Sequence, residues 1–149
     1  MENTFQNYVK DAEKAFQTAD HLAYVTLPLL KEKKLLIPII ENIDKALSKS
    51  MHALFHHTHT TPPTHFDEQV TLLEKIIPTY KINKELILII KEVRTIMKHH
   101  EKSAVEFIRN NNYVVCDDKY RIKKLDEEQV KSILFHTRPF IQFLRSLQC

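Results

Sequence analysis

The sequence contains no glycine among its 149 residues, and this absence limits the folds and sites that the chain can build. Glycine supplies the tightly turned backbone of phosphate-binding loops, dinucleotide-binding turns and the sharp turn that carries a hydrolase nucleophile. Most nucleotide-dependent enzymes and hydrolases of these kinds are therefore excluded. No motif in the sequence requires a cofactor, and we expect none.

The remaining composition is that of an ordinary folded domain. Hydrophobic residues make up 43% and charged residues 28%, a balance that argues against wholesale disorder. The length fits one domain, and we expect a single domain over residues 1–149. The formal net charge of +3 is small, so net charge alone would steer the protein only weakly toward nucleic acid.

The sequence predicts a cytoplasmic protein without membrane contact. Cys116 and Cys149 are the two cysteines, and the second lies at the chain end, where a structural disulfide is not expected. The sequence has no C-x-x-C pair, so it does not indicate a zinc ribbon or a redox centre. The first residues lack the pattern of a secretory signal, and no apolar run approaches the ~20 residues of a membrane span.

Helical periodicity dominates the sequence. Apolar residues recur at steps of three and four, which is typical of helices that bury one face. The short charged connection after the first segment favours an antiparallel neighbour. The predicted helices cover residues 4–30, 35–56 and 66–77, a fourth segment capped by Asn83, and a last segment from Asp126 to the C-terminus.

Local signals mark the ends of these helices. Asn3 or Thr4 can cap the first helix, because their side chains accept hydrogen bonds from the first turn. Asp126 can open the last helix with a capping box. Pro28 marks a kink or an end of the first helix, and Pro139 predicts a bend in the last.

The pattern changes before the last helix. Two β-type runs, at residues 104–109 and 113–116, flank three asparagines, which tolerate the positive φ that a tight turn needs. A third strand could follow at residues 120–122. Because an isolated hairpin is marginal in water, we expect it to pack on the helices through Phe107, Tyr113 and Val115. The predicted fold is mainly α, an antiparallel four- or five-helix bundle with a small β-hairpin inserted at about residues 104–123, before the last helix.

The first candidate site is an arginine and a histidine on the fourth helix. Arg94 and His99 are five positions apart, so their side chains can approach a common edge of the helix. Arginine can hold a phosphate with two hydrogen bonds, and histidine can exchange a proton near neutral pH. These properties suit metal-free cleavage of RNA. The same residues are also ordinary on the polar side of an amphipathic helix.

The chain resembles the HEPN superfamily, small helical bundles that accompany minimal nucleotidyltransferases and occur in defence or RNA-processing systems. The resemblance rests on residues 12–19 and 43–54 in the two opening helices, on the helix opening at residues 65–67, and on the spacing of Arg94 and His99. Catalytically active members use an arginine–histidine motif as a metal-independent ribonuclease site, usually across a dimer. The resemblance implies that Arg94 binds phosphate and that His99, or else His100, transfers a proton.

Other functions stay open. Many HEPN members act without catalysis, so the chain could instead be an interaction module that dimerises or docks a protein partner. The sequence does not decide whether the protein is an enzyme. The chain is also similar to small archaeal helical proteins, a likeness that implies no function.

A histidine cluster is the second candidate site. His52 and His56 lie four positions apart at the end of the second helix, and His59 follows in the loop. Imidazoles at this spacing can reach one metal ion, and a loop histidine could complete three ligands. Short histidine-rich tracts also bind metal without functional meaning.

The third candidate is a basic stretch that also contains a tyrosine, and it predicts contact with RNA. In a strand, alternate cations would share one face, and an exposed tyrosine could stack on a base. The alternative interpretation is a solvated face with an inward tyrosine. The candidate nucleic-acid-binding residues are Arg109, Lys119, Tyr120, Arg121, Lys123 and Lys124.

Overall fold

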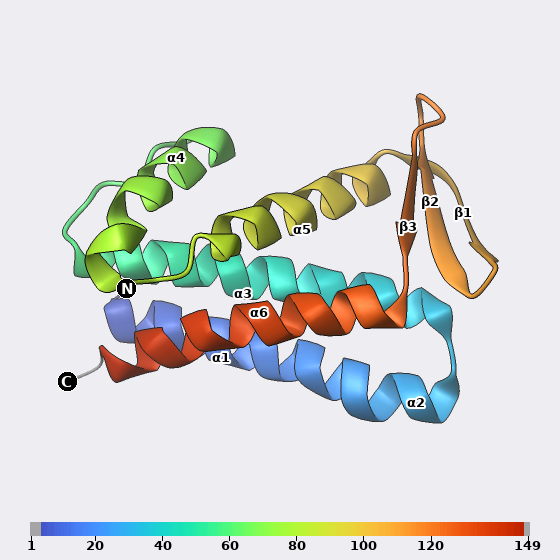
Figure 1. Cartoon of the computed structure of the whole chain (residues 1–149), viewed down its shortest axis with the longest axis horizontal. Helices are drawn as coiled ribbons and strands as arrows, with labels where there is room; N and C mark the ends of the chain where they lie inside the picture. The colour runs from blue at the N-terminus through green and yellow to red at the C-terminus, as the bar shows by residue number, and fades with distance from the viewer. Residues whose placement is uncertain (1–3, 148–149) are drawn as a thin grey trace.

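The computed structural model describes residues 4–147, which form a mainly helical protein with a small antiparallel sheet before the last helix. Two residues of the sequence predictions, Asn3 and Cys149, lie outside this range. Figure 1 shows the long helices lying along the longest axis of the molecule and the sheet standing at one end of them. No helix within residues 4–147 is long and apolar enough to cross a membrane.

The first helix comprises three consecutive parts, α1 (Phe5–His21), a π-helical turn at Leu22–Thr26, and α2 (Leu27–Leu30). Thr4 caps it, because its hydroxyl accepts a hydrogen bond from the backbone N–H of Asn7 at 3.2 Å. Pro28 stays within the helix, just after the π-helical turn. A π-turn of this kind accommodates a residue that lacks a backbone N–H.

Helix α3 (Leu36–His57) is the centre of the fold and follows a 3-10 turn at Lys33–Leu35. It contacts α1, α5 (Glu85–Glu101) and α6 (Glu127–Ser146). Figure 1 shows these four helices running in alternating directions along the molecule. Helix α4 (Phe66–Ile76) and the 3-10 turn Ile77–Tyr80 cover the end of α3 that lies away from the sheet.

The cap predicted at Asp126 is confirmed, but the full capping box does not form, because Gln129 Nε2 donates to Glu92 Oε1. Asn83 lies one residue before Lys84, the N-cap of α5. Asn83 Oδ1 accepts a hydrogen bond from the N–H of Glu85 at 2.9 Å, and Asp126 Oδ1 accepts one from Gln129 at 2.7 Å. Pro139 lies inside α6. One hydrophobic cluster extends from Phe5 to Leu144 and includes side chains from the helices and from the sheet.

The sheet has the strand order β1 (Ser103–Arg109), β2 (Asn112–Asp117) and β3 (Ile122–Leu125). Asn110 and Asn111 form the first turn at φ values of 50° and 68°, as their residue type predicted. The prediction for the third strand was wrong in position, because β3 begins at Ile122 and Tyr120 lies in the preceding turn at φ 61°.

Alternation along the strands gives the sheet an inner face against the helices and an outer face toward solvent. Tyr113 and Val115 are buried on the inner face, as predicted. The prediction that Phe107 anchors the sheet was wrong. It pairs with Val114 and remains 39% exposed on the outer face.

Backbone with positive φ occurs at six residues of the described chain, all of them non-glycine. Lys31 ends α2 and Lys81 ends the 3-10 turn after α4, each in the left-handed region that glycine usually occupies at helix ends. Side chains in this region cost roughly 1–2 kcal/mol each. The glycine-free sequence therefore closes its turns with side-chain-bearing residues.

Candidate functional site

Arg94 lies in a groove between α4 and α5. Its guanidinium carbon lies 4.2 Å from the centroid of the Phe66 ring, and its Nη2 lies 3.4 Å from Asp44 Oδ1 on α3. The Arg94 Nε is buried and makes no hydrogen bond within residues 4–147. Burial raises the pKa of Asp44, and the charge of Arg94 only partly offsets this effect. The groove has a volume of about 350 Å³ and is open to solvent beside Lys91 and Lys98.

His99 leaves α5 in a different direction and meets the sheet. Its Nδ1 lies 3.0 Å from the carbonyl oxygen of Thr95, and its Nε2 lies 3.9 Å from Asp117 Oδ2 on β2. His99 does not line the groove that contains Arg94. Five positions at 3.6 residues per turn place two side chains about 140° apart around a helix. Within one chain, therefore, the structure does not bring Arg94 and His99 together.

Asp117 organises the turn between β2 and β3. Its Oδ1 accepts hydrogen bonds from the backbone N–H groups of Lys119 and Arg121 at 2.9 and 2.8 Å, and its Oδ2 accepts one from Arg121 Nε at 2.8 Å. Burial alone would raise the pKa of Asp117, but these hydrogen bonds and the charge of Arg121 hold it below its ordinary value. The ionised carboxylate fixes a turn whose tip is Tyr120, 85% exposed.

His100 belongs to a second cluster, on the inner face of the sheet. Its Nδ1 lies 2.6 Å from Glu106 Oε2, and the Tyr113 hydroxyl donates a hydrogen bond to Glu106 Oε1 at 2.6 Å. Burial would raise the pKa of Glu106, but hydrogen bonds led by that of Tyr113 hold it below its ordinary value. Burial and the same carboxylate raise the pKa of Tyr113 to about 12. Glu106 is therefore an ionised acceptor, and Ser103 is a further hydrogen-bond partner beside Tyr113 and His100.

The predicted nucleic-acid-binding residues divide into two groups. Arg109 and Lys124 line a hollow of about 270 Å³ on the outer face, together with Phe107 and Ile122. Lys119 and Tyr120 lie in the exposed turn beside this face.

The other two predicted cations already hold carboxylates. Arg121 pairs with Asp117, and Lys123 pairs with Glu92 on α5. Lys123 and Glu92 meet because Lys123 falls on the inner side of β3, where alternation turns it toward the helices.

The histidines of the predicted metal site contact aromatic rings at the other end of the molecule. The ring centroids of His52 and His56 lie 5.8 and 6.3 Å from that of Tyr8, and His52 Nδ1 lies 2.7 Å from the carbonyl oxygen of Ser48. His59 follows α3 with a φ of 55°. No three histidine, cysteine, aspartate or glutamate side chains of residues 4–147 come together as metal ligands, so the three histidines do not form the predicted set.

Sequence reasoning missed Glu106, Asp117 and Tyr113 as members of polar clusters. Their partners are fixed by the strand register and by the packing of the sheet on α5, which no local pattern reveals. The alternation of β1 gave one indication, because it places the charged side chain of Glu106 on the strand face that turns toward the helices.

Comparison of the chain with protein-family models, with curated proteins and with solved structures finds no match.

Proposed function

We propose that the protein is a module that binds single-stranded RNA through the outer face of its sheet, presented at one end of an antiparallel helical bundle. The observation that carries the proposal is the hollow lined by Phe107, Ile122, Arg109 and Lys124. It combines an accessible aromatic ring with two cations on one small surface. Aromatic rings that stack on bases and cations that contact phosphates are the two elements of single-strand recognition.

The charge distribution supports the proposal. Among the described strand residues, no acidic side chain falls on the outer face, because Glu106 and Asp117 alternate to the inner one. Lys119 and Tyr120 extend the surface at the adjoining turn, and Tyr120 is 85% exposed. Asn112 adds an amide that can hydrogen-bond to base edges. The resemblance to proteins of RNA-processing systems favours RNA over DNA.

The arrangement favours binding over cleavage. His99 contacts Thr95 and Asp117, while Arg94 contacts Asp44 and Phe66 on other elements. A ribonuclease site needs the base and the cation at one phosphate. Cleavage by Arg94 and His99 stays a prediction, and it would require a second copy of the chain to supply the missing partner.

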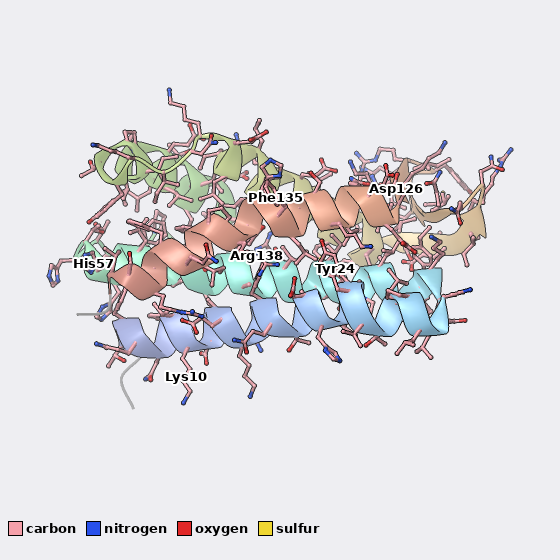
Figure 2. All side chains as sticks on the ribbon, turned by 60° about the horizontal axis from the view of Figure 1, so that its bottom comes forward. Lys10, Tyr24, His57, Asp126, Phe135 and Arg138 are labelled. Atoms are coloured by element: carbon pink, nitrogen blue, oxygen red, sulfur yellow. The ribbon has the colours of Figure 1, made fainter. Side chains whose placement is uncertain are left out.

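Fluorescence anisotropy with a labelled single-stranded oligouridine, in buffer with EDTA, tests the proposal. We expect binding that weakens with salt, and a loss of about tenfold in affinity for Phe107→Ala, because one stacked base is removed. The double variant Arg109→Ala/Lys124→Ala should lower the salt dependence, since two phosphate contacts are lost. Lys10→Ala is the matched control, because Lys10 is exposed on α1 away from the sheet (Figure 2).

The same samples separate the alternatives. Equal affinity of the four proteins, or no binding at low salt, would reject the RNA-binding face. Binding of a deoxyoligonucleotide with equal affinity would leave a single-strand binder without RNA preference. A concentration-dependent dimer that Phe107→Ala dissociates would assign the face to self-association instead. Cleavage of the oligouridine by the parent protein, but not by Arg94→Ala or His99→Ala, would establish the ribonuclease.

A further inference from the structure

A cavity of about 470 Å³ lies between helix α6 and the connection from α4 to α5. Its lining comes from within residues 80–86, where the 3-10 turn ends and α5 begins, and from within residues 135–143 of α6. Ile82, Leu86 and Pro139 contribute apolar surface to it. A cavity of this size with an apolar wall and a few polar groups is typical of sites for small molecules.

Aromatic rings gather at this cavity. Four of the thirteen phenylalanine and tyrosine rings of the chain line it, namely Tyr80, Phe135, Phe140 and Phe143. Tyr80 and Phe143 pack edge to face, with ring centroids 5.7 Å apart. Phe140 is buried, whereas Phe135 on α6 is 70% exposed (Figure 2), so the rings extend from the inside of the cavity to its mouth. Because contacts between rings add to the energy of burial, this wall favours a flat aromatic ligand over an aliphatic one.

The charges at the cavity favour an anionic ligand. Lys81 lines the cavity, is exposed, and makes no ion pair within residues 4–147. Glu85 also lines the cavity, and its Oε2 lies 3.5 Å from His136 Nε2. Lys84, the exposed neighbour of Glu85 in the chain, adds a second cation. Two lysines against one glutamate leave a net positive charge whether His136 is neutral or protonated.

The start of α5 adds to this positive potential. Glu85 is the first residue of the helix, so the positive end of the helix dipole lies beside the cavity. Lys81 can reach a ligand at the mouth, because its ammonium group lies on a long, flexible stem and carries three donors. An ammonium that donates to a carboxylate forms one of the stronger hydrogen bonds in proteins.

We propose that this cavity binds a small aromatic carboxylate, with the ring of the ligand against Phe135 and the Tyr80–Phe143 pair and its carboxylate held by Lys81. The site is separate from the proposed RNA-binding face, since its lining comes from the α4–α5 connection, α5 and α6 and not from the strands. Either proposal can therefore fail alone.

Calorimetric titration of the full chain near neutral pH tests the proposal with three probes of similar size: naphthoate, naphthylmethanol and decahydronaphthoate. We expect naphthoate to bind about tenfold more tightly than naphthylmethanol, which lacks the charge. We expect it to bind about fivefold more tightly than decahydronaphthoate, which lacks the aromatic rings. These comparisons use the parent protein alone, so no variant has to fold for them.

Two variants assign the two preferences to residues. Phe135→Leu keeps an apolar side chain at an exposed position, and it should weaken naphthoate about fivefold while decahydronaphthoate changes little. The control is Phe107→Leu, which changes an exposed ring on the sheet and should leave naphthoate binding unchanged.

Lys81→Gln should weaken naphthoate about tenfold and leave naphthylmethanol unaffected. Its matched control is Lys31→Gln, because Lys31 also ends a helical segment with positive φ but lies on α2. Thermal melting of each variant confirms that it is folded. Failure of the parent to bind naphthoate, equal affinity for the three probes, or unchanged naphthoate affinity in Phe135→Leu or in Lys81→Gln would each overturn the proposal.

Discussion

Histidines lie at both ends of the molecule, and the two ends hold them by different interactions. At the end formed by the start of α1 and the end of α3, His57 and His56 contact aromatic rings, with ring centroids 5.3 Å from Phe5 and 6.3 Å from Tyr8. Figure 2 shows His57 at the end of the molecule away from Asp126, which precedes α6 beside the sheet. At that sheet end, His99 and His100 contact carboxylates.

The difference determines what each histidine can do. Contact with an aromatic ring fixes where an imidazole lies but not which nitrogen carries its proton. A hydrogen bond to an ionised carboxylate, such as Glu106 with His100, also requires a proton on the nitrogen that faces the carboxylate. The histidines whose proton positions are constrained by carboxylates therefore lie at the sheet end.

The largest effect is expected from removing the ring of Phe5, at the end of the molecule where α1 begins and α3 ends. Phe5 is buried, and Phe5→Ala should reduce the free energy of unfolding by about 3 kcal/mol, because a cavity replaces the ring. The reduction should be the same at mildly acidic and mildly alkaline pH, since the ring carries no charge. Urea unfolding at both pH values measures it, with Phe135→Ala as a control that changes a largely exposed ring. A loss of unfolding free energy that depends strongly on pH would contradict the contrast between this end of the molecule and the sheet end.

An intermediate effect is expected at the sheet end, where stability should depend on pH. Glu106→Gln should cost about 1–2 kcal/mol at neutral pH, because the hydrogen bonds from Tyr113 and His100 lose an ionised acceptor. The folded pKa of Glu106 lies below the ordinary value of 4.5, so its stabilisation is present above that value and lost as the pH falls through the folded pKa. Stability curves of parent and variant should therefore converge in acid.

Comparison of the parent and variant curves separates the contribution of Glu106 from that of Asp117. Its pKa is also lowered, so it contributes an acid-dependent loss of stability to parent and variant alike. The difference between the two curves then isolates Glu106. Parallel curves down to strongly acidic pH would show that the cluster does not require an ionised Glu106.

The smallest effect is expected for a histidine that the structure leaves exposed. His56→Gln should change the free energy of unfolding by no more than about 0.5 kcal/mol, because His56 is exposed and its tilted ring lies with its centroid 6.3 Å from that of Tyr8. Thermal melting with added zinc and with EDTA should give the same midpoint for parent and variant. A zinc-dependent rise that His56→Gln abolishes would restore a metal site at this end.

The parts of the fold that local chemistry determines could be predicted from the sequence. Thr4 and Asp126 cap helices through bonds to residues three positions away, Asn83 accepts a hydrogen bond from the first residue of α5, and the asparagine turn depends on the residues within it. The start of β3 could not be predicted, because Asp117 draws the following N–H groups into a turn and delays the strand to Ile122.

The candidate site was less predictable than the fold, because its contacts join distant elements. Spacing on α5 indicated that Arg94 and His99 share an edge, yet Arg94 meets α3 and α4 while His99 meets the sheet. Which face of β1 turns outward depends on how the sheet docks, so the exposure of Phe107 was not visible in its residue type.

Tyr120 shows what the lack of glycine means for the design of this surface. A bulky ring occupies a backbone conformation that glycine would adopt without penalty, and Asp117 holds it there by accepting hydrogen bonds from the flanking residues. Replacing the tyrosine by glycine would relax the turn and remove the most exposed aromatic side chain beside the sheet. At position 120, glycine would favour stability, whereas tyrosine provides an exposed aromatic ring beside the sheet. The sequence has the tyrosine.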